Sequence, residues 1–475
     1  MGAPWDVASP DEQLFVMVTG ANSGIGLATC ERLINEFLLT RALTGHLILL
    51  PTTRSASKAL DTISHLRRHA SDFARTSLAL RNRSPSSYDP QSVVSRIHIL
   101  SPQVDLCDVR GIRDLAERLC TGEMGNPKGL EGEYLHAVRV PRLDAVVLNA
   151  GFGGWSGFNV FGAIWQIGSQ GIQRSVTWPN FKTPMPTRIL NKQPGYDYPP
   201  KPPLGEVFCA CVFGHYLLVH HLLPLLCRAS PSDTPARVIW SSSVEAVASA
   251  FIPSDIQALS NPIAYESAKR LTDLLALTTS LPSSSPHSRQ WLTPSDANVA
   301  AQKPCPPKVY LSHPGVVAST LFPVPWFLFW AYKWILVVAR WLGSPWHCAT
   351  SYIASKSAGW LVMEPQASLD ASQAERVKWG STCDTKLRES VKRTEVDGWG
   401  WEGKPVDAEK VRSDTAEGVL HMSIGRNKIR DTTEEDVKQF EELGKQCWQE
   451  MERLRAVWEE IAEEKGMLDA QINGK

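Results

Sequence analysis

A short apolar run followed at once by a glycine-rich turn constrains the fold of this 475-residue chain most strongly. Residues 14–18 (LFVMV) predict a buried strand, and residues 19–38 (TGANSGIGLATCERLINEFL) predict a tight turn that leads into an amphipathic helix. Further strand-like segments, with helical stretches between most of them, occur at residues 46–50, 97–100, 145–148, 237–240 and 309–311. This alternation predicts an α/β fold in which helices cover both faces of a doubly wound parallel sheet.

Changes in composition divide the chain into regions. Two stretches interrupt the α/β pattern: residues 152–205 are dense in glycine, proline and aromatic side chains, and residues 281–308 predict a surface excursion. Residues 71–96, rich in serine and arginine, predict a solvated connection, whereas the apolar spacing in residues 433–465 fits a helix with one face packed on the body or on a partner. The expected regions are an N-terminal tail (1–13), the α/β domain (14–360) and a mostly helical C-terminal extension (361–475).

Charge and cysteine patterns argue against two classes of function. Lys and Arg together number 49, as do Asp and Glu, so the formal net charge is 0 and a nucleic-acid partner is not expected. The ten cysteines form no CxxC pair and have no histidine at a zinc-site spacing, so we expect free thiols and no metal. Residues 1–13 lack the charged and apolar regions of a secretory signal.

The glycine-rich turn predicts a dinucleotide site. Gly20, Gly24 and Gly26 stand where a backbone must turn tightly, approach a pyrophosphate and let a helix pack closely. The helix that follows offers free N–H groups to the phosphates. The residues expected in this part of the site are Thr19, Gly20, Asn22, Ser23, Gly24, Ile25 and Gly26.

The end of the second strand predicts which dinucleotide binds. The residues after it (PTTR) include no carboxylate to accept ribose hydroxyls, and Arg54, with Lys58 a turn later, favours a 2′-phosphate and therefore NADPH. The alternative is that Arg54 is a plain surface charge. Asp105 follows a strand and is placed to accept from the adenine amino group, while Asn149 and Gly151 close another strand beside the cofactor. The alternative is that these three residues only end their strands and do not contact the cofactor.

Tyr265 and Lys269 predict acid–base chemistry. They lie four residues apart, which places both side chains on one face of a helix. A phenol with a pKa near ~10 is a reluctant acid. A nearby ammonium favours the phenolate, which brings the phenol closer to the range needed to protonate a developing alkoxide. Upstream, residues 241–243 end a strand with three hydroxyls, one of which can hydrogen-bond a substrate carbonyl.

The motifs TGxxxGxG, NAG, a strand-end serine and YxxxK occur in this order along the chain. Together they make residues 14–360 resemble the short-chain dehydrogenase/reductase family, which has a Rossmann-type fold. The resemblance implies that Ser243 polarises the substrate carbonyl and that Tyr265 donates the proton. It also implies that Lys269 tunes Tyr265, and that Lys269 and Tyr265 contact the nicotinamide ribose.

Further segments extend and narrow this resemblance. Residues 313–319 (HPGVVAS) match the family segment that cups the nicotinamide, which implies cofactor contacts by Val317 and by Ser319, where the family often has threonine. Other segments resemble the fungal 3-ketosteroid reductases of sterol C-4 demethylation, at residues 176–182 (VTWPNFK), 213–226 (FGHYLLVHHLLPLL), 237–246 (RVIWSSSVEA) and 265–278 (YESAKRLTDLLALT).

The narrower resemblance implies an activity and a location. The activity is NADPH-dependent reduction of a 3-keto-4-methyl sterol to the 3β-alcohol in ergosterol synthesis. The location is the cytosolic face of the endoplasmic reticulum membrane and of lipid droplets, alongside other sterol C-4 demethylation enzymes. Two alternatives stay open: a reductase of 17-ketosteroids or retinoids, and a non-catalytic protein that binds sterol or organises sterol enzymes. Intact Ser243, Tyr265 and Lys269 argue against the second.

Cys211 departs from the family pattern. Many members carry an asparagine at this place, where it helps to hold a water for proton relay, and a thiol is a poor substitute for an amide. We expect His215 or a backbone carbonyl to support that water instead. The gap of 22 positions from Ser243 to Tyr265 is longer than in much of the family but fits the sterol subgroup.

Residues 321–342 (LFPVPWFLFWAYKWILVVARWL) predict contact with a membrane. The stretch is long enough to span a bilayer, but two prolines open it and two basic residues share one helical face. Its tryptophans suit a headgroup boundary. We favour a helix that lies on the membrane surface and roofs the sterol entrance, with a spanning helix or a buried soluble helix as alternatives. Residues 152–205 are expected to form another wall of the pocket or a structural loop.

Overall fold

An eight-stranded sheet forms the centre of the computed structural model, which describes residues 2–83, 88–130, 135–185, 187–295, 297–318, 329–405 and 431–473. Neighbouring strands are parallel except for β9 and β10. Their order is β10 (Glu389–Thr394), β9 (Lys378–Cys383), β8 (Lys308–His313), β7 (Arg237–Ser241), β4 (Ala145–Leu148), β1 (Gln13–Val18), β2 (His46–Pro51) and β3 (Ile97–Ile99).

Burial on both faces explains why the central strands are continuous apolar runs. Successive side chains of a strand point to opposite faces of a sheet. In β1, Phe15 and Met17 enter one hydrophobic core, whereas Val16 and Val18 enter the other. A parallel sheet covered on both sides therefore selects branched apolar residues at every position rather than at alternate ones.

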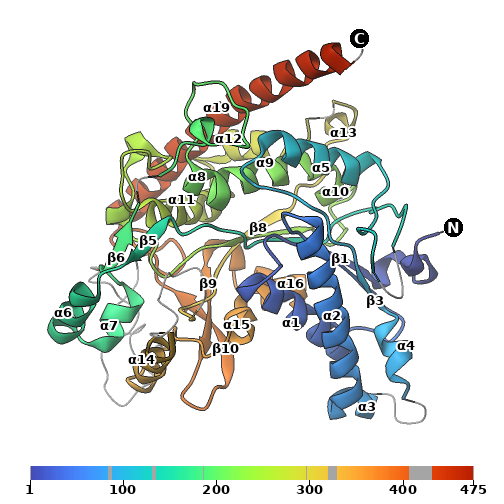
Figure 1. Ribbon diagram of the computed structural model, residues 1–475, viewed down its shortest axis with the longest axis horizontal. Helices are drawn as coiled ribbons and strands as arrows, with labels where there is room; N and C mark the ends of the chain where they lie inside the picture. The colour runs from blue at the N-terminus through green and yellow to red at the C-terminus, as the bar shows by residue number, and fades with distance from the viewer. Residues whose placement is uncertain are drawn as a thin grey trace.

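Helices form a layer on each face of this sheet (Figure 1). The helices on one face are α5 (Val109–Thr121), α8 (Glu206–Phe208), α9 (Gly214–His221), α10 (Leu223–Leu226), α11 (Ala264–Thr278), α12 (Ser285–Trp291) and α19 (Glu434–Asn473). Those on the other face are α1 (Gly24–Thr40), α2 (Ala56–Thr76), α3 (Leu78–Arg83), α4 (Pro90–Val94), α16 (Lys356–Met363) and α17 (Gln366–Ala371). The predicted doubly wound α/β fold is confirmed.

The sheet contains two strands that were not predicted from the sequence, β9 and β10, which lie beyond β8 at one edge. Every strand predicted from the sequence is present, but β9 and β10 come from the region expected to be mostly helical. Their sequences, KWGSTC and ESVKRT, carry polar residues where a buried strand normally carries apolar ones. Burial of Lys378 at the start of β9 is possible because Asp273 on α11 neutralises it.

The prediction of a solvated connection over residues 71–96 is wrong for much of that stretch. Helix α2 continues to Thr76, and α3 and α4 follow within it, while residues 84–87 lie outside the described part of the chain. Leu66 and Ala70 pack into the core beneath the sheet, and Ala74, four residues further along the helix, is also buried. Of the residues that suggest a loop, Arg75, Arg81 and Ser92 are exposed on these helices, whereas Arg96 is buried.

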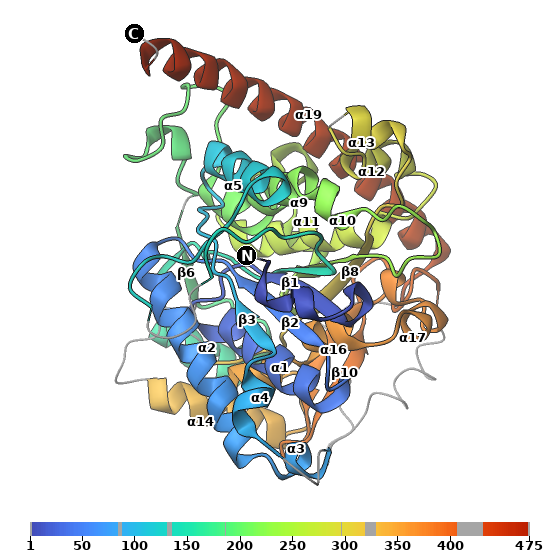
Figure 2. The same ribbon diagram turned by 90° about the vertical axis from the view of Figure 1, so that its right-hand side faces the viewer.

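The C-terminal helix packs on the body of the same chain, as Figures 1 and 2 show for α19. Phe440, Trp448, Met451, Leu454 and Trp458 on its inner face are all buried. The excursion at residues 281–308 is not confined to the surface, because Trp291 of α12 is buried between Tyr216 and Trp448.

A separate lobe lies beyond the C-terminal ends of the strands, at the lower left of Figure 1. It contains the hairpin of β5 (Trp155–Phe158) and β6 (Lys182–Pro184) and three helices, α6 (Val160–Gln170), α7 (Ile172–Thr177) and α14 (Phe329–Trp341). Val176 of α7 packs on Leu336 and Ala339 of α14. Among the described residues, none of the helices has the length and apolarity needed to span a bilayer, and residues 319–328 lie outside the described part.

Candidate active site

The glycine-rich loop packs directly on the end of β4. A Cβ atom on Gly20 would lie 2.9 Å from Cα of Ala150, and one on Gly26 would lie 2.5 Å from the side chain of Asn149. The hydroxyl of Thr19 accepts hydrogen bonds from the backbone N–H groups of Asn149 and Ala150, at 2.9 and 3.0 Å. Gly20 has a φ of +64°, a left-handed conformation that favours glycine. These glycines are therefore required by close approach and by the turn itself.

The N-terminus of α1 fits the phosphates of a dinucleotide. Ser23 is its N-cap residue and makes no side-chain hydrogen bond to the helix, so it leaves the first-turn N–H groups to a ligand. Gly24 has a φ of +57°, and a Cβ on it would meet no atom within 4 Å. Asn22 is half-buried, and Ile25 lines the pocket described below. The predicted phosphate-binding residues are thus gathered around one helix end.

Arg54 and Asp105 lie together, as the NADPH hypothesis requires. They line a surface hollow of about 690 Å³ with residues of α5. Asp105 accepts hydrogen bonds from the backbone N–H of Cys107 at 2.9 Å and from the hydroxyl of Tyr196 at 3.0 Å. Lys58 is exposed in the first turn of α2 and does not line this hollow.

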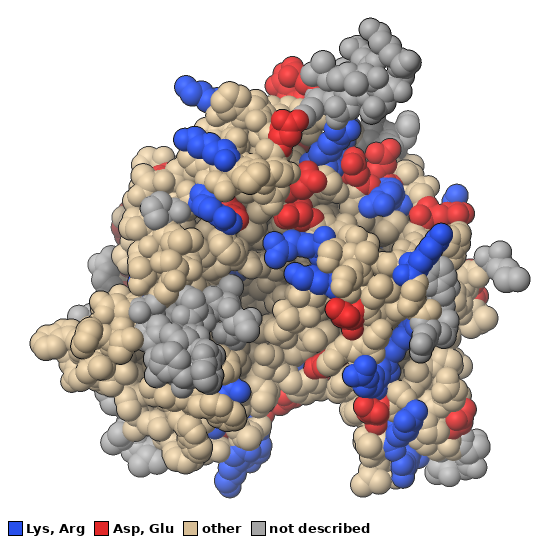
Figure 3. Space-filling model, in the orientation of Figure 1, with Lys and Arg blue, Asp and Glu red and all other residues tan. Residues whose placement is uncertain are grey.

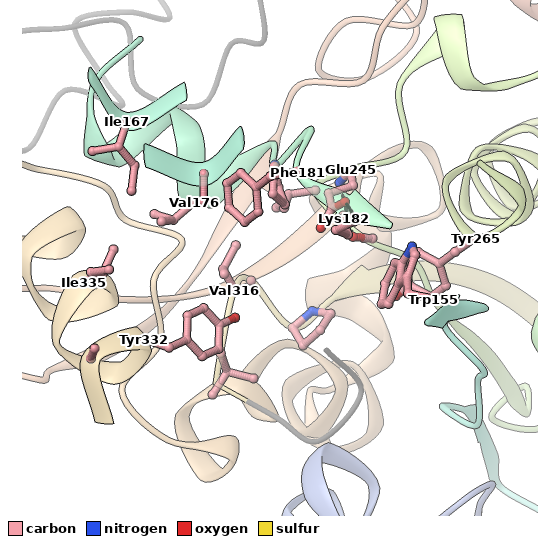
Figure 4. Close-up of a pocket in the computed structure, with 18 of the residues that line it drawn as sticks. Trp155, Ile167, Val176, Phe181, Lys182, Glu245, Tyr265, Val316, Tyr332 and Ile335 are labelled. Atoms are coloured by element: carbon pink, nitrogen blue, oxygen red, sulfur yellow. Dashed lines mark hydrogen bonds and ion pairs between the residues drawn. The ribbon is translucent and has the colours of Figure 1, made fainter. Parts of the chain in front are cut away.

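Ser243 and Tyr265 both line an apolar pocket of about 280 Å³, and Figure 4 shows Tyr265 at one end of it. Ser243 follows β7, whereas Tyr265 lies in the first turn of α11, so both project from the C-terminal edge of the sheet. The Ser243 hydroxyl lies close enough to the phenol to lower the pKa of Tyr265. The oxygen of Ser243 accepts from the backbone N–H of Glu245 at 3.1 Å, which fixes its position. The structure therefore brings together the two hydroxyls that the sequence analysis predicted to act on a carbonyl.

Lys269 lies beside Tyr265, but burial governs the pKa of the phenol. The Lys269 ammonium is 5.5 Å from the centroid of the Tyr265 ring and donates to the carbonyl of Ser241 at 2.7 Å. Burial raises the pKa of Tyr265 well above its usual value, and the nearby hydroxyl of Ser243 opposes this rise. Burial also lowers the pKa of Lys269. The expected lowering of the phenol pKa by its neighbouring ammonium is therefore not found in the protein alone.

His215 has no ring nitrogen free for the expected relay water, and support of that water by a backbone carbonyl stays a prediction. Cys211 lies in a π-helical turn (Cys209–Phe213), and its sulfur is 3.4 Å from both the N and the O of Phe152. His215 is fully buried, with Nε2 2.8 Å from the Thr19 hydroxyl and Nδ1 3.3 Å from the carbonyl of Cys211. Burial lowers its pKa to about 3. Both ring nitrogens are engaged, so His215 supports the glycine-rich loop rather than a relay water.

The segment predicted to cup the nicotinamide forms the floor of the pocket. Pro314, Gly315, Val316 and Val317 all line it. The N–H of Val316 donates to the carbonyl of Trp346 at 2.7 Å, which holds the segment in place. Ser319, the last residue assigned to this contact, lies outside the described part of the chain. Gly151, at the end of β4, lies beside Cys211, whose sulfur would be 3.6 Å from a Cβ at that position.

Residues 152–205, called the insertion from here on, and helix α14 form the remaining walls of the pocket, as expected from the sequence. Trp155 and Phe181 come from the hairpin, Ile167 from α6, and Tyr332 and Ile335 from α14. Figure 4 shows Trp155 beside Tyr265 at one end and the α14 residues at the other. The pocket thus places two hydroxyls at one end of a mostly apolar chamber.

Two sets of ion pairs near the site were not predicted from the sequence. Lys378 of β9 donates to the carbonyl of Ser243 and to Asp273, both at 2.7 Å. Lys182 of β6 pairs with Glu245 and Glu266 on the pocket wall. Lys182 and Glu245 fall within segments that resemble the 3-ketosteroid reductases, but the sequence assigns them no role. Only the folded structure shows that these charged residues lie near Ser243 and Tyr265.

This fold, with Ser243, Tyr265 and Lys269 beside a glycine-rich dinucleotide loop, defines a short-chain dehydrogenase/reductase. A 3-keto-steroid reductase ERG27 from Gibberella zeae is 55% identical to the chain over 460 residues, covering 97% of each. A 3-keto-steroid reductase erg27 from Aspergillus fumigatus is 37% identical over 464 residues, covering 95% of each. The chain belongs to the 3-keto-steroid reductase family, and is an oxidoreductase that uses a nicotinamide dinucleotide. No family model matched it.

Proposed function

We propose that this protein uses NADPH to reduce the 3-keto group of a 4-methyl sterol intermediate to the 3β-hydroxyl in ergosterol synthesis. The observation that carries the proposal is the pocket that places Ser243 and Tyr265 at one end of a mostly apolar chamber. Such a chamber suits a substrate with one polar group on a rigid hydrocarbon frame. Family membership supports the same substrate class, because both relatives are named for the reduction of 3-keto steroids.

Each catalytic side chain has a distinct task in this reduction. Bound NADPH supplies the hydride that adds to the carbonyl carbon. Ser243 donates a hydrogen bond to the carbonyl oxygen, which stabilises the negative charge that develops there. Tyr265 gives its proton to the same oxygen and is left as a phenolate, which the nearby Lys269 ammonium stabilises.

Arg54 supports NADPH over NADH as the cofactor. It is exposed at the hollow that it shares with Asp105, where a 2′-phosphate could receive charge-assisted hydrogen bonds. Residues 51–54, which follow β2, include no carboxylate to accept ribose hydroxyls.

We also propose that the protein docks on a lipid surface, that of the endoplasmic reticulum membrane or of lipid droplets. The two helices that wall the pocket expose large apolar side chains: Phe161 and Trp165 on α6, and Trp330, Trp334 and Trp341 on α14. Val160 and Ile164 on α6 are also exposed, and they line the pocket itself. Phe161 and Trp165 are 85% and 78% exposed, which is unusual for side chains of this size.

The charge of this surface favours lipid. Helices α6, α7 and α14 contain arginine and lysine but no aspartate or glutamate. Figure 3 shows few charged side chains on this lobe, in contrast to the upper part of the same face. An apolar, weakly basic surface at the mouth of a pocket lets a membrane-dissolved substrate enter without crossing water. Contact with other sterol C-4 demethylation enzymes stays a prediction from the sequence.

Substrate profiling tests the proposed reaction. Purified protein is incubated with NADPH and either 3-keto-4-methyl sterols, 17-ketosteroids or retinal, and the loss of NADPH absorbance is followed with identification of the product. The proposal expects a 3β-hydroxysterol as the favoured product. Faster turnover of a 17-ketosteroid or of retinal would favour the alternative reductase, and no turnover of any ketone would favour the non-catalytic protein.

Vesicle flotation tests the lipid surface. Phosphatidylcholine vesicles with added phosphatidylserine should carry the protein to the top of a gradient, and the double variant Phe161→Ser/Trp165→Ser should stay at the bottom. Leu78→Ser is the matched control, because Leu78 is 71% exposed on α3, away from this lobe. Equal flotation of the double variant and the control would contradict this docking surface.

A further inference from the structure

Three ionisable side chains meet on the pocket wall beside Tyr265. The ammonium of Lys182 forms ion pairs with one oxygen of Glu245 and with one oxygen of Glu266. The Lys182 side chain is only 5% exposed. Lys182 and Glu245 both line the substrate pocket, and Glu266 directly follows Tyr265 in α11. Figure 4 shows Lys182 and Glu245 close to Tyr265 and Trp155.

Lys182 connects three segments that are far apart in the sequence. It belongs to β6 in the insertion, Glu245 belongs to the loop after β7 that carries Ser243, and Glu266 belongs to the catalytic helix. These three segments are therefore joined through one ammonium. A buried charge is stable only when it is paired in this way.

The same ammonium also holds an aromatic side chain against the catalytic tyrosine. Lys182 Nζ lies 4.2 Å from the centroid of the Trp155 ring, a cation–π contact. Trp155 in turn packs on Tyr265, with ring centroids 4.8 Å apart and planes inclined by 61°. Trp155 thus connects Lys182 to the side of the phenol ring that faces the insertion.

We propose that Lys182 is a positioning residue for the reduction: its ion pairs with Glu245 and Glu266 clamp the insertion onto the catalytic segments and hold Trp155 against Tyr265. Within this clamp, Glu245 makes proton donation by Tyr265 depend on pH. The inference rests on the ketone reduction proposed above and gives a role to residues for which the sequence motifs imply none. Lys182, Glu245 and Trp155 each act through Tyr265 rather than on the cofactor.

The charge of Glu245 determines the direction of the pH effect. The groups that face it are Lys182 from β6, Glu266 and Tyr265 from α11, and Tyr332 from α14. Burial, opposed by Lys182, raises the pKa of Glu245 to about 7. Ionised Glu245 raises the pKa of Tyr265, which disfavours the phenolate formed on proton donation. Below this pH the clamp keeps the contact of Lys182 with Glu266 and a hydrogen bond from Lys182 to neutral Glu245. Reduction should therefore slow as the pH rises through about 7.

Replacing Lys182 tests the clamp. We expect Lys182→Met to lower kcat/KM by about 100-fold, because small displacements of a catalytic group have effects of this size. The dissociation constant for NADPH should change far less, because the glycine-rich loop and Arg54, which are expected to bind its phosphates, lie on other segments. Lys182→Arg keeps the charge and should restore most of the loss. Lys192→Met is the matched control, since Lys192 lies in the same insertion and forms no ion pair among the described residues.

Replacing Glu245 tests whether its ionisation causes the pH dependence of the reduction. Glu245→Gln keeps the shape of the side chain and removes its titration, so the fall of kcat through about pH 7 should disappear. An unchanged inflection in Glu245→Gln, or equal kcat/KM in Lys182→Met and Lys182→Arg, would overturn the inference.

A measurement that needs no turnover distinguishes this inference from the proposed reaction. Hydrogen exchange of the backbone at residues 155–158 and 182–184 should become faster in Lys182→Met and stay at the wild-type rate in Lys182→Arg. If the unmodified protein reduces no ketone while exchange responds in this way, the proposed reaction fails and the clamp stands. If the protein reduces a sterol ketone while Lys182→Met changes neither the exchange rate nor kcat/KM, the clamp fails.

Discussion

The ammonium of Lys378 lies 2.7 Å from Oδ2 of Asp273, and both side chains are buried. Lys378 begins β9, and Asp273 lies one turn beyond Lys269 on α11. The ammonium also donates to the carbonyl of Ser243, and Asp273 accepts from the hydroxyl of Ser242. The ion pair therefore fixes the strand end that carries the catalytic serine.

Removing one member of this pair should destabilise the protein. Lys378→Met leaves Asp273 buried without its counter-charge, which costs about 3–5 kcal/mol of unfolding free energy. Urea denaturation measures this loss, and the double variant Lys378→Met/Asp273→Leu should recover part of it because no unpaired charge remains. A loss below about 1 kcal/mol in the single variant would be typical of an exposed pair and would contradict this role.

Ser243→Ala should reduce catalysis without affecting the cofactor. The variant loses the hydroxyl that lines the pocket with Tyr265 and that is placed to donate to the substrate oxygen. We expect kcat to fall roughly 10²- to 10³-fold, as for other single donors to a developing oxyanion. Steady-state kinetics and NADPH fluorescence titration measure the two effects. Weakened NADPH binding with unchanged kcat would assign Ser243 to the cofactor instead.

Arg54→Ala should discriminate between the two dinucleotides. Hydrogen bonds to a charged phosphate contribute about 1.5–3 kcal/mol, which corresponds to roughly 10- to 100-fold weaker binding of NADPH when they are lost. Binding of NADH should not change. Arg289→Ala is the control, because Arg289 is an exposed residue of α12. If calorimetry shows NADPH and NADH affected equally, or neither affected, Arg54 does not read the 2′-phosphate.

Acid should destabilise the fold through its buried histidines. Burial lowers the pKa of His215 to about 3 from an unperturbed 6.5, so the unfolded chain binds a proton that the folded chain excludes. Stability is then complete above about pH 6.5 and declines below it, by about 1.4 kcal/mol per pH unit for each such histidine. Unfolding free energies at pH 7 and pH 5 should differ less in His215→Gln. Partly exposed His287→Gln should keep the wild-type difference, and an equal change in both variants would refute this origin.

The sequence predicts the fold well where a strand is buried along nearly its whole length. Strands such as β1 and β2 are apolar at nearly every position, so their location follows from local residues alone. β9 cannot be found in this way, because it buries Lys378, Ser381 and Thr382, whose partners lie on α11, α15 (Ser351–Ala354), α16 and β10. A polar strand is recognisable only once its tertiary partners are known.

The site is predictable to the extent that its chemistry is carried by motifs. Spacing alone brings Tyr265 and Lys269 together on one helix, and the order of the motifs points to Ser243. The protonation behaviour of Tyr265 does not follow from spacing, because burial outweighs the ammonium that the sequence places nearby. Lys182 and Trp155 escape prediction because they reach the site from an insertion whose path is set by tertiary packing.

Replacement of Tyr265 by phenylalanine, assayed with NADPH and a 3-keto-4-methyl sterol, tests the central claim most directly. The phenol hydroxyl is the proton donor in this account, so its removal should lower kcat by at least about 10²-fold while NADPH binds with unchanged affinity. The ring stays in place against Trp155, so the fold should be intact and the melting temperature close to that of the wild type. Turnover near the wild-type rate would contradict the account.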